Sequence, residues 1–270
     1  MSEGGNVLSA TQQQKADAFC ALHEGEPFVI PNPWDAGSAR VMENLGFKAL
    51  ATTSGGFAFT LGREDGEVGL EELAEHVIAL DQATSLPVSV DLENGFGSAP
   101  EDAATAIAHA AAAGAVGGSI EDYGHEDGIY ALDHAVERVA AAAEAARNLD
   151  FPFTFTARAE NHIRGNPDLE ETIARLQAFE AAGADVLYAP GLRSADEVRA
   201  VCEATTKPVN VLAHPGLSMA EVVVAGAQRV SVGSSLAWVA VEAMAGAAER
   251  IRDEGDFSGL RISGAHRLSQ

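Results

Sequence analysis

Acidic side chains stand at the end of the segment Val88–Asp91, which contains two valines and comes directly after Pro87. The segment predicts a short strand whose carboxyl end carries Asp91 and Glu93. Side chains two positions apart on a strand point the same way, so we expect the two carboxylates to converge. Two hard oxygen ligands at one strand end suit Mg²⁺ or Mn²⁺, which bind few protein carboxylates and keep water ligands. The alternative is a solvated strand end followed by a Gly-rich turn.

Glu121 and Arg158 each stand at the end of a later apolar segment. Glu121 would share a divalent cation with Asp91 and Glu93, form a salt bridge with Arg158, or do both. A guanidinium group binds a carboxylate through two parallel hydrogen bonds. Arg158 is therefore expected to hold a substrate carboxylate, and neutralising Glu121 is its alternative role.

Two Gly- and Ser-rich segments follow predicted strands. Ser54, Gly55 and Gly56 would supply backbone N–H donors to an anion, as Gly-rich turns do, or form an ordinary tight loop. Residues 233–235 follow the last predicted strand, where some barrels bind phosphate. An unrelated phosphate-binding barrel is therefore an alternative, and it predicts no role for Asp91.

The lysines and cysteines exclude two kinds of covalent catalysis. Lys15 precedes the first strand, whereas Lys48 and Lys207 stand where strands begin, at the wrong end for a Schiff-base lysine. Cys20 and Cys202 fall within predicted helices and suit packing better than catalysis. Two isolated thiols without metal-type spacing also indicate a reducing cytoplasm.

The chain alternates apolar segments that favour strands with segments that favour helices. The predicted strands cover residues 28–31, 49–53, 88–91, 115–120, 153–157, 185–188, 209–212 and 229–232. Capping boxes begin at Ser98, Ser194 and Ser218, and helix-ending glycines stand at Gly46, Gly114, Gly183 and Gly226. This alternation predicts one (β/α)8 TIM barrel over residues 1–270. An open doubly wound sheet is the rival, but no glycine fingerprint follows the first strand.

The polar residues gather on one side of the predicted strands. The segments that follow the strands contain acidic, arginine and histidine residues, whereas the segments that precede the strands contain few candidate functional residues. Active sites of TIM barrels lie at the carboxyl ends of the strands, so this asymmetry predicts an enzyme.

The composition of the chain limits the kinds of partner that it can bind. The chain has 40 acidic and 17 basic residues, a formal net charge of -23, which argues against nucleic acid or an anionic membrane as a partner. Residues 1–20 lack the basic start and apolar core of a signal peptide. The uncharged stretch 103–120 is rich in Ala and Gly and fits a helix and strand better than a membrane span. We expect a cytoplasmic protein.

Several motifs in this order resemble those of the isocitrate lyase/phosphoenolpyruvate mutase superfamily. They are Asp-x-Glu-Asn-Gly-Phe-Gly at 91–97, Ile-Glu-Asp at 120–122, Ala-Arg at 157–158, Pro-Asn-Pro-Trp-Asp at 31–35, Ser-Ala-Arg at 38–40, Thr-Thr-Ser-Gly at 52–55, and Asp65 in Gly-Arg-Glu-Asp-Gly. The resemblance covers nearly the whole chain. Within the superfamily, the sequence is most similar to members of the 2-methylisocitrate lyase and oxaloacetate decarboxylase kind.

The resemblance implies an enzyme that uses Mg²⁺ or Mn²⁺ and acts on a small 2-oxo acid or dicarboxylate through an enolate. The implied metal residues are Asp91, Glu93 and Glu121, and the implied substrate residues are Trp34, Ser54, Gly55, Gly56 and Arg158. The implied catalytic residues are Asp65, Glu121 and Arg158, to which we add His125 as a candidate proton donor from this chain's own residues. It also implies a homodimer or homotetramer that exchanges the last helix between subunits. The apolar segment 236–251 suits such a helix.

Where the sequence departs from the superfamily pattern, some of the superfamily's activities are not expected. The lyases carry Lys-Lys-Cys-Gly-His after the fourth strand, where this chain has Tyr-Gly-His-Glu-Asp-Gly at 123–128. The mutase lysine and asparagine are missing there, Pro190 replaces a mutase histidine, and Glu93 replaces an aspartate. We therefore predict no cleavage of isocitrate or 2-methylisocitrate.

The remaining residues predict a lyase that breaks a C–C bond or decarboxylates a 2-oxo acid. His125, His162 and His214 are the candidate proton donors. A phosphonopyruvate-type hydrolase or phosphomutase is one alternative, and a barrel that binds 2-oxo acids without turning them over is another.

Overall fold

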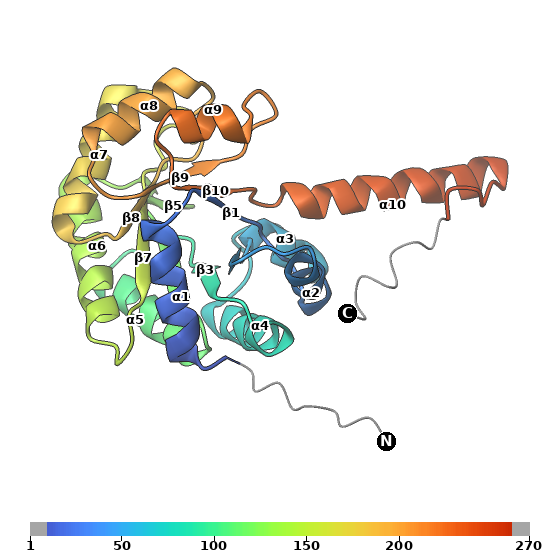
Figure 1. Ribbon diagram of the computed structural model, residues 1–270, viewed down its shortest axis with the longest axis horizontal. Coiled ribbons are helices and arrows are strands. Elements are labelled where there is room, and N and C mark those ends of the chain that lie inside the picture. Colours follow the sequence, from blue (N-terminus) through green and yellow to red (C-terminus); the bar gives the residue numbers. More distant parts are fainter. Residues whose placement is uncertain (1–9, 261–270) are drawn as a thin grey trace.

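Eight parallel strands form a nearly closed barrel surrounded by helices in the computed structural model, which describes residues 10–260 (Figure 1). The barrel strands are β1 (Phe28–Ile30), β2 (Leu50–Ala51), β3 (Val88–Asp91), β4 (Gly117–Glu121), β7 (Thr154–Arg158), β8 (Val186–Tyr188), β9 (Val209–Leu212) and β10 (Arg229–Ser231). Their order is β1–β10–β9–β8–β7–β4–β3–β2. Between the two end strands, the Ala51 amide donates to the Pro31 carbonyl at 3.0 Å. The predicted TIM barrel is confirmed.

The helices lie outside the strands. They are α1 (Gln12–Glu24), α2 (Ala36–Asn44), α3 (Ser54–Thr60), α4 (Leu70–Ala83), α5 (Pro100–Ala112), α6 (Leu132–Arg147), α7 (Leu169–Ala182), α8 (Ala195–Ala204), α9 (Met219–Val224) and α10 (Ser235–Glu254). The main apolar core lies between strands and helices, and α5 and α6 contribute mostly buried alanines to it. Small side chains let two helices lie close together while burying apolar surface.

The helix boundaries agree with the local sequence signals except at one place. Ser194 and Ser218 form the predicted capping boxes with Glu197 and Glu221. The box predicted at Ser98 is wrong, because Ala99 is the N-cap of α5 and its amide donates to Asp102 at 2.9 Å. Pro100, which has no N–H to satisfy, takes the first helical position and moves the helix start by one residue.

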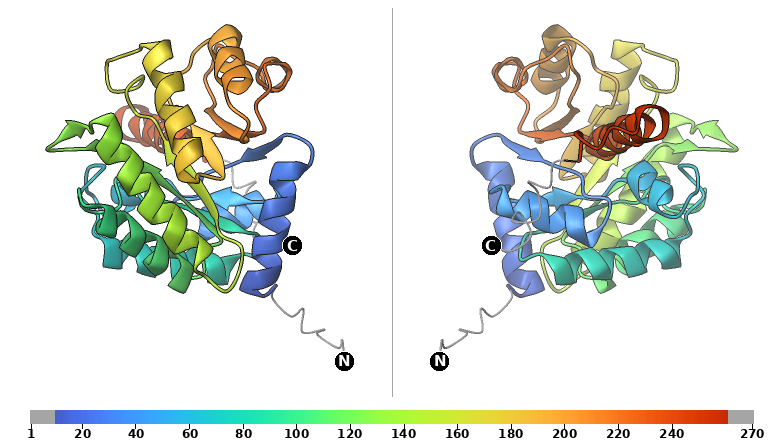
Figure 2. Two further views of the ribbon diagram at one scale, coloured as in Figure 1. Left: turned by 90° about the vertical axis from the view of Figure 1, so that its left-hand side faces the viewer. Right: turned by 90° about the vertical axis from the view of Figure 1, so that its right-hand side faces the viewer.

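Two elements were not predicted. Ser54, Gly55 and Gly56 form the first turn of α3 instead of a turn between strand and helix, with Thr53 as the N-cap. After β4 the chain forms a small antiparallel hairpin from β5 (Tyr123–Gly124) and β6 (Gly128–Ile129). Figure 2 shows this hairpin projecting at the edge of the molecule. The hairpin contains Tyr-Gly-His-Glu-Asp-Gly at 123–128, the segment in which the sequence departs from the superfamily pattern.

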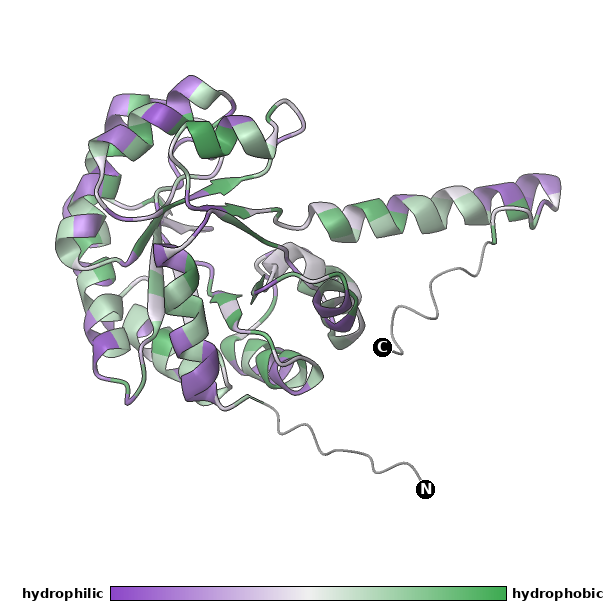
Figure 3. Ribbon diagram, viewed as in Figure 1, coloured by the Kyte–Doolittle hydropathy of each residue, from purple (hydrophilic) through white to green (hydrophobic). Residues whose placement is uncertain are grey.

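The helix α10 extends away from the barrel (Figure 1). Figure 3 shows apolar residues along most of it and polar residues at its far end. The side chains of Leu236, Trp238, Val239 and Met244 are exposed. No helix within residues 10–260 has the length and apolar character needed to span a membrane.

Candidate active site

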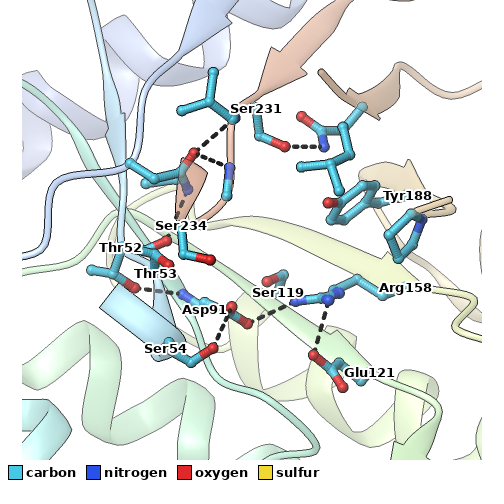
Figure 4. Close-up of a pocket in the computed structure, with 18 of the residues that line it drawn as sticks. Thr52, Thr53, Ser54, Asp91, Ser119, Glu121, Arg158, Tyr188, Ser231 and Ser234 are labelled. Atoms are coloured by element: carbon cyan, nitrogen blue, oxygen red, sulfur yellow. Dashed lines mark hydrogen bonds and ion pairs between the residues drawn. The ribbon is translucent and has the colours of Figure 1, made fainter. Parts of the chain in front are cut away.

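A cavity of about 310 Å³ opens at the carboxyl ends of the barrel strands (Figure 4). Its polar lining comes from nearly every strand and the segment that follows it: Asn32, Thr52, Thr53, Ser54, Asp65, Ser89, Asp91, Ser119, Glu121, Arg158, Glu160, Arg164, Tyr188, Asn210, Arg229, Ser231, Ser234 and Ser235. Among the described residues 10–260, no lysine, cysteine or histidine belongs to this lining. The exclusion of a Schiff-base lysine and a cysteine nucleophile therefore agrees with the geometry of this cavity.

Arg158 lies at the centre of the charged wall. Its Nη1 atom is 2.9 Å from Oδ1 of Asp91, and Nη2 is 2.9 Å from Oε1 of both Glu121 and Glu160. Nε also donates to Glu160, at 3.0 Å. The salt bridge between Arg158 and Glu121, expected as an alternative, is therefore present. The hydrogen bonds from Nη1 to Asp91 and from Nε to Glu160, together with the two ion pairs of Nη2, show that protein carboxylates surround most of this guanidinium.

A second guanidinium lies beside this network. Arg164 contacts Glu121 at 3.4 Å and Glu160 at 3.2 Å, and its guanidinium carbon lies 4.0 Å from the centre of the Tyr123 ring. Glu160 has an exposed side-chain fraction of only 1%, so both arginines stabilise a carboxylate that has almost no access to water. The Arg164 contact also connects the charged wall to the β5–β6 hairpin.

Burial and mutual repulsion shift the ionisation of the acidic groups. Burial raises the pKa of Glu121 well above its ordinary value, and Glu160 and Asp91 raise it further against the opposing effect of Arg158. The pKa of Glu93 rises to about 8, because of burial first and of repulsion from Asp91 and Asp65 second. For Arg158, burial lowers the pKa, but Glu121, Glu160 and Asp91 raise it well above its ordinary value. Burial is thus the main reason why Glu121 and Glu93 hold a proton more tightly than exposed glutamates do.

The predicted convergence of Asp91 and Glu93 on one strand is wrong. Strand β3 ends at Asp91, and Glu93 has a positive φ of 48° within a tight turn closed by a 2.7 Å bond from Gly95 N to the Leu92 carbonyl. The two-residue periodicity of a strand stops where the extended backbone stops. The Glu93 side chain does not line the cavity, although Glu93 stays close enough to Asp91 to raise its own pKa.

Of the other predicted site residues, Ser54, Gly55 and Asp65 belong to the cavity lining. The Ser54 hydroxyl donates to Oδ2 of Asp91 at 3.3 Å. A Cβ atom on Gly55 would lie 3.5 Å from the Asp65 carboxyl carbon, so the two residues are in contact.

Trp34 and Gly56 lie outside the cavity lining and pack against each other. A Cβ atom on Gly56 would lie 3.1 Å from Cβ of Trp34 and 2.6 Å from Cγ2 of Thr53. Gly56 therefore permits α3 to pack closely. Trp34 lines an apolar groove between α2 and the start of α10.

None of the three candidate histidines lines the cavity. His125 is exposed on the β5–β6 hairpin, where its ring would collide with a Cβ atom on Gly66. His162 is buried near Glu197, with 3.9 Å between its Nε2 and Oε1. His214 is exposed, and its Nδ1 accepts a hydrogen bond from Gly216 N at 3.0 Å.

The structure adds a polar wall that the motifs did not indicate. Tyr188, Asn210, Arg229 and Ser231 all line the cavity, and Figure 4 shows Tyr188 and Ser231 on the side away from Asp91 and Glu121. Burial raises the pKa of Tyr188 to about 12, and its ring centre lies 5.1 Å from the guanidinium carbon of Arg158. A usable signal was that Arg229 and Ser231 alternate with apolar residues on the last strand, which places both on the inner face.

The donor set suits a divalent cation that keeps water ligands. Within residues 10–260, no group of three or more His, Cys, Asp or Glu side chains is already arranged around one point. Asp91 and Glu121 nevertheless face one cavity from neighbouring strands. The pKa of Glu93 is raised first by burial and then by repulsion from Asp91 and Asp65, and a cation would relieve the second of these effects. Mg²⁺ binds through one or two carboxylates and several waters, so this set fits it.

The fold and this site define a TIM-barrel protein with an arginine–carboxylate cavity, and the relatives are of the same kind. The chain is 50% identical to a structure from Burkholderia cenocepacia J2315 assigned to the lyases or mutases, with a TM-score of 0.92 and coverage of 96% of this chain and 95% of that one. It is 30% identical over 255 residues to an oxaloacetate decarboxylase of Rhodopseudomonas palustris (strain BisB5), covering 89% of this chain and 86% of the relative.

A structure of oxaloacetate acetylhydrolase with its product oxalate is 25% identical and has a TM-score of 0.85. The match covers 96% of this chain and 93% of that one. The phosphoenolpyruvate phosphomutase family model matches residues 19–252. The chain therefore belongs to that family, within the isocitrate lyase/phosphoenolpyruvate mutase superfamily of lyases and mutases that act on 2-oxo acids. The resemblance found in the sequence motifs is confirmed.

Proposed function

We propose that the protein is a Mg²⁺-dependent lyase that decarboxylates, or cleaves a C–C bond in, a small 2-oxo dicarboxylate through an enolate. The carrying observation is a single cavity in which Asp91, Glu121 and Arg158 face a protonated tyrosine, Tyr188. This arrangement combines substrate binding with a proton source and needs no covalent nucleophile. The similarity to an oxaloacetate decarboxylase supports an oxaloacetate-like substrate.

Arg158 binds the carboxylate next to the 2-oxo group. Arg158 lines the cavity, and its Nη1 contact with Asp91 is the one that a cation on Asp91 would weaken. Asp91 would hold Mg²⁺ directly, with Glu121 and Glu93 in support through water. A bound Mg²⁺ stabilises the negative charge of an enolate and orients the 2-oxo acid.

Tyr188 supplies the proton that completes the reaction. In an oxaloacetate-like acid, the bond from C3 to the departing carboxylate breaks, CO₂ leaves, and the electron pair stays in the enolate. The Tyr188 hydroxyl then transfers its proton to C3, which gives pyruvate, and the phenolate regains a proton from water. Because its pKa is about 12, Tyr188 holds this proton at neutral pH. We give this role to Tyr188 rather than to His125, His162 or His214, because Tyr188 lines the cavity.

The test is a substrate panel of 2-oxo acids, 2-hydroxy acids and phosphonates with Mg²⁺ or Mn²⁺, following pyruvate, CO₂ and phosphate. We expect pyruvate and CO₂ from an oxaloacetate-like acid and no product from isocitrate or 2-methylisocitrate. Phosphate release from phosphonopyruvate would instead establish a hydrolase. Binding of oxalate without turnover of any compound would establish a 2-oxo-acid-binding barrel.

The exposed apolar face of α10 supports a homo-oligomer. Leu236, Val239 and Met244 lie three to five positions apart on one side of this helix, and their exposed fractions are 37%, 64% and 63%. Leu236 also borders the apolar groove formed with α2. We propose that a second copy covers this surface, by the helix exchange that the superfamily resemblance implies. The unpaired thiols of Cys20 and Cys202 suit a reducing compartment such as the cytoplasm.

A further inference from the structure

Arg229 lines the cavity, and within residues 10–260 its guanidinium has no carboxylate among its hydrogen-bond partners. Its side chain is buried, with an exposed fraction of 5%. Nε donates to Oδ1 of Asn210 at 2.8 Å, Nη2 donates to Thr156 at 3.0 Å, and Nη1 lies 3.2 Å from Nε2 of His23. Burial lowers the pKa of Arg229 to about 10, so the group stays charged at neutral pH. A buried cation bound only by neutral groups is costly, which suggests a specific task.

Hydrogen bonds with a defined direction lead from Arg229 to the cavity. The arginine donates to the oxygen of Asn210, which fixes the orientation of that amide group. Nδ2 of Asn210 then donates to the Ser231 hydroxyl at 2.9 Å. That bond uses a lone pair of the Ser231 oxygen, so the Ser231 hydrogen remains available to donate elsewhere. Tyr188 lines the same cavity, and Ser231 lowers the pKa of Tyr188 against the larger, opposing effect of burial.

The register of the strands places these residues next to one another across β8, β9 and β10. Tyr188 on β8 pairs with Asn210 on β9, and Asn210 pairs with Arg229 on β10. Ser231 points to the same inner face as Arg229, two residues further along β10. Figure 4 shows Ser231 and Tyr188 on the same side of the cavity, opposite Asp91 and Glu121.

We propose that Arg229, Asn210 and Ser231 are positioning residues that keep the Tyr188 oxygen supplied with a hydrogen bond and leave its O–H to donate into the cavity. This inference rests on the proposed function for the proton's destination, but the hydrogen-bond chain is testable without any substrate. When Tyr188 loses its proton, the Ser231 hydrogen bond stabilises the phenolate. Losing any link should therefore make Tyr188 a weaker acid and slow proton transfer.

Two variants break the chain without adding charge. Ser231→Ala removes the last donor, and Arg229→Lys keeps the positive charge but loses the planar group that orients Asn210. Ser98→Ala and Arg193→Lys are the matched controls, because both residues are exposed and neither lies on the cavity. Chemical denaturation of each variant measures folding stability separately.

The pKa of Tyr188 is the quantity to measure, because it would not change if these residues had only a structural role. The protein is labelled with 3-fluorotyrosine, which lowers the pKa of a phenol into an accessible range, and followed by ¹⁹F NMR against pH. Tyr188→Phe assigns the Tyr188 signal against those of Tyr123 and Tyr130. The charged groups that act on Tyr188 are Arg158, Glu160, Asp91 and Arg229, and both variants leave their charges unchanged.

We expect Ser231→Ala and Arg229→Lys to raise the pKa of fluorinated Tyr188 by at least about half a unit, with no shift in the controls. For the 2-oxo acid that the enzyme turns over, kcat should fall about tenfold or more while KM changes less than about threefold. An unchanged pKa in both variants would overturn the inference, whatever the substrate. If the wild-type protein turns over no 2-oxo acid, the proposed function fails, while the NMR result still decides the role of this chain.

Discussion

The two walls of the cavity hold their polar groups in different ways. On the wall formed by β3, β4 and β7, carboxylates and guanidiniums contact one another directly, as Arg158 does with Asp91, Glu121 and Glu160. On the wall formed by β8, β9 and β10, neutral hydroxyl and amide groups are connected by hydrogen bonds to one buried arginine, Arg229. The first wall suits binding of a cation and a carboxylate, whereas the second suits storage of a proton.

The difference teaches how one barrel can separate two tasks. Ionised groups close together shift each other's pKa values strongly, and a proton donor placed among them would not keep its proton reliably. Tyr188 forms no ion pair in that network, and burial is the largest cause of its raised pKa, ahead of the effects of Arg158, Glu160 and Asp91. Each wall can therefore be altered without removing the charges of the other.

The largest effect is expected from removing the central carboxylate of the charged wall. Asp91→Ala should abolish Mg²⁺-dependent binding of oxalate, because it removes the group that would hold the cation directly. Calorimetry with Mg²⁺ or Mn²⁺ plus oxalate measures the binding, and addition of a chelator to the wild-type protein should reproduce the loss. Equal binding by the variant would show that the cation lies elsewhere.

The next effect comes from the shape of the guanidinium. Arg158→Lys keeps the charge but loses the planar donor group. We expect oxalate affinity to fall by about 2–4 kcal/mol, the usual range for truncating one partner of a buried charge pair. Because Arg158 also stabilises buried Glu160, the free energy of unfolding should fall as well. A stability loss with unchanged oxalate binding, measured by denaturation and calorimetry, would limit Arg158 to a structural role.

On the neutral wall, Tyr188→Phe should lower kcat about 100-fold with little change in KM, because it removes the proton and retains the ring. Oxalate binding should stay close to the wild-type value, which provides the control. If kcat is unchanged, the proton comes from another group and the two walls do not divide binding from proton transfer.

A smaller effect is expected on the pH dependence of stability. Glu93 has a pKa of about 8 in the folded protein, above its ordinary value of 4.5. The folded state therefore binds the proton more tightly than the unfolded state, and stability falls as pH rises from about 4.5 through 8. Glu93→Gln should reduce this decline by a few degrees in Tm at most. Thermal scans without metal between these pH values measure it, and parallel declines in both proteins would contradict it.

The smallest effect on the cavity is expected from α10. Met244→Asp places a charge on its exposed apolar face and should shift the protein from oligomer to monomer in sedimentation, with the cavity residues unaffected. Glu242→Gln, an exposed polar position on the same helix, is the control. A wild-type protein that is already a monomer at micromolar concentration would refute the proposed helix exchange.

Local sequence signals were enough for the positions of the strands and for much of the charged wall. All eight predicted strands are present within a few residues of their predicted positions. Eight apolar segments that alternate with helices ending at glycines are compatible with few folds other than this barrel. Asp91, Glu121 and Arg158 were predicted together because strand ends of a parallel barrel meet at one rim. Glu93 was misplaced because strand periodicity says nothing about where a strand stops.

The sequence by itself determined the repeating strands and helices, the barrel, and the identity of the acidic groups at the rim, because these depend on neighbours within a few residues. Only the tertiary structure decided that Arg158 binds three carboxylates, that His125 lies outside the cavity, and that Ser231 connects through Asn210 to Arg229. Those contacts join strands distant in sequence, and their geometry follows from the strand register around the barrel.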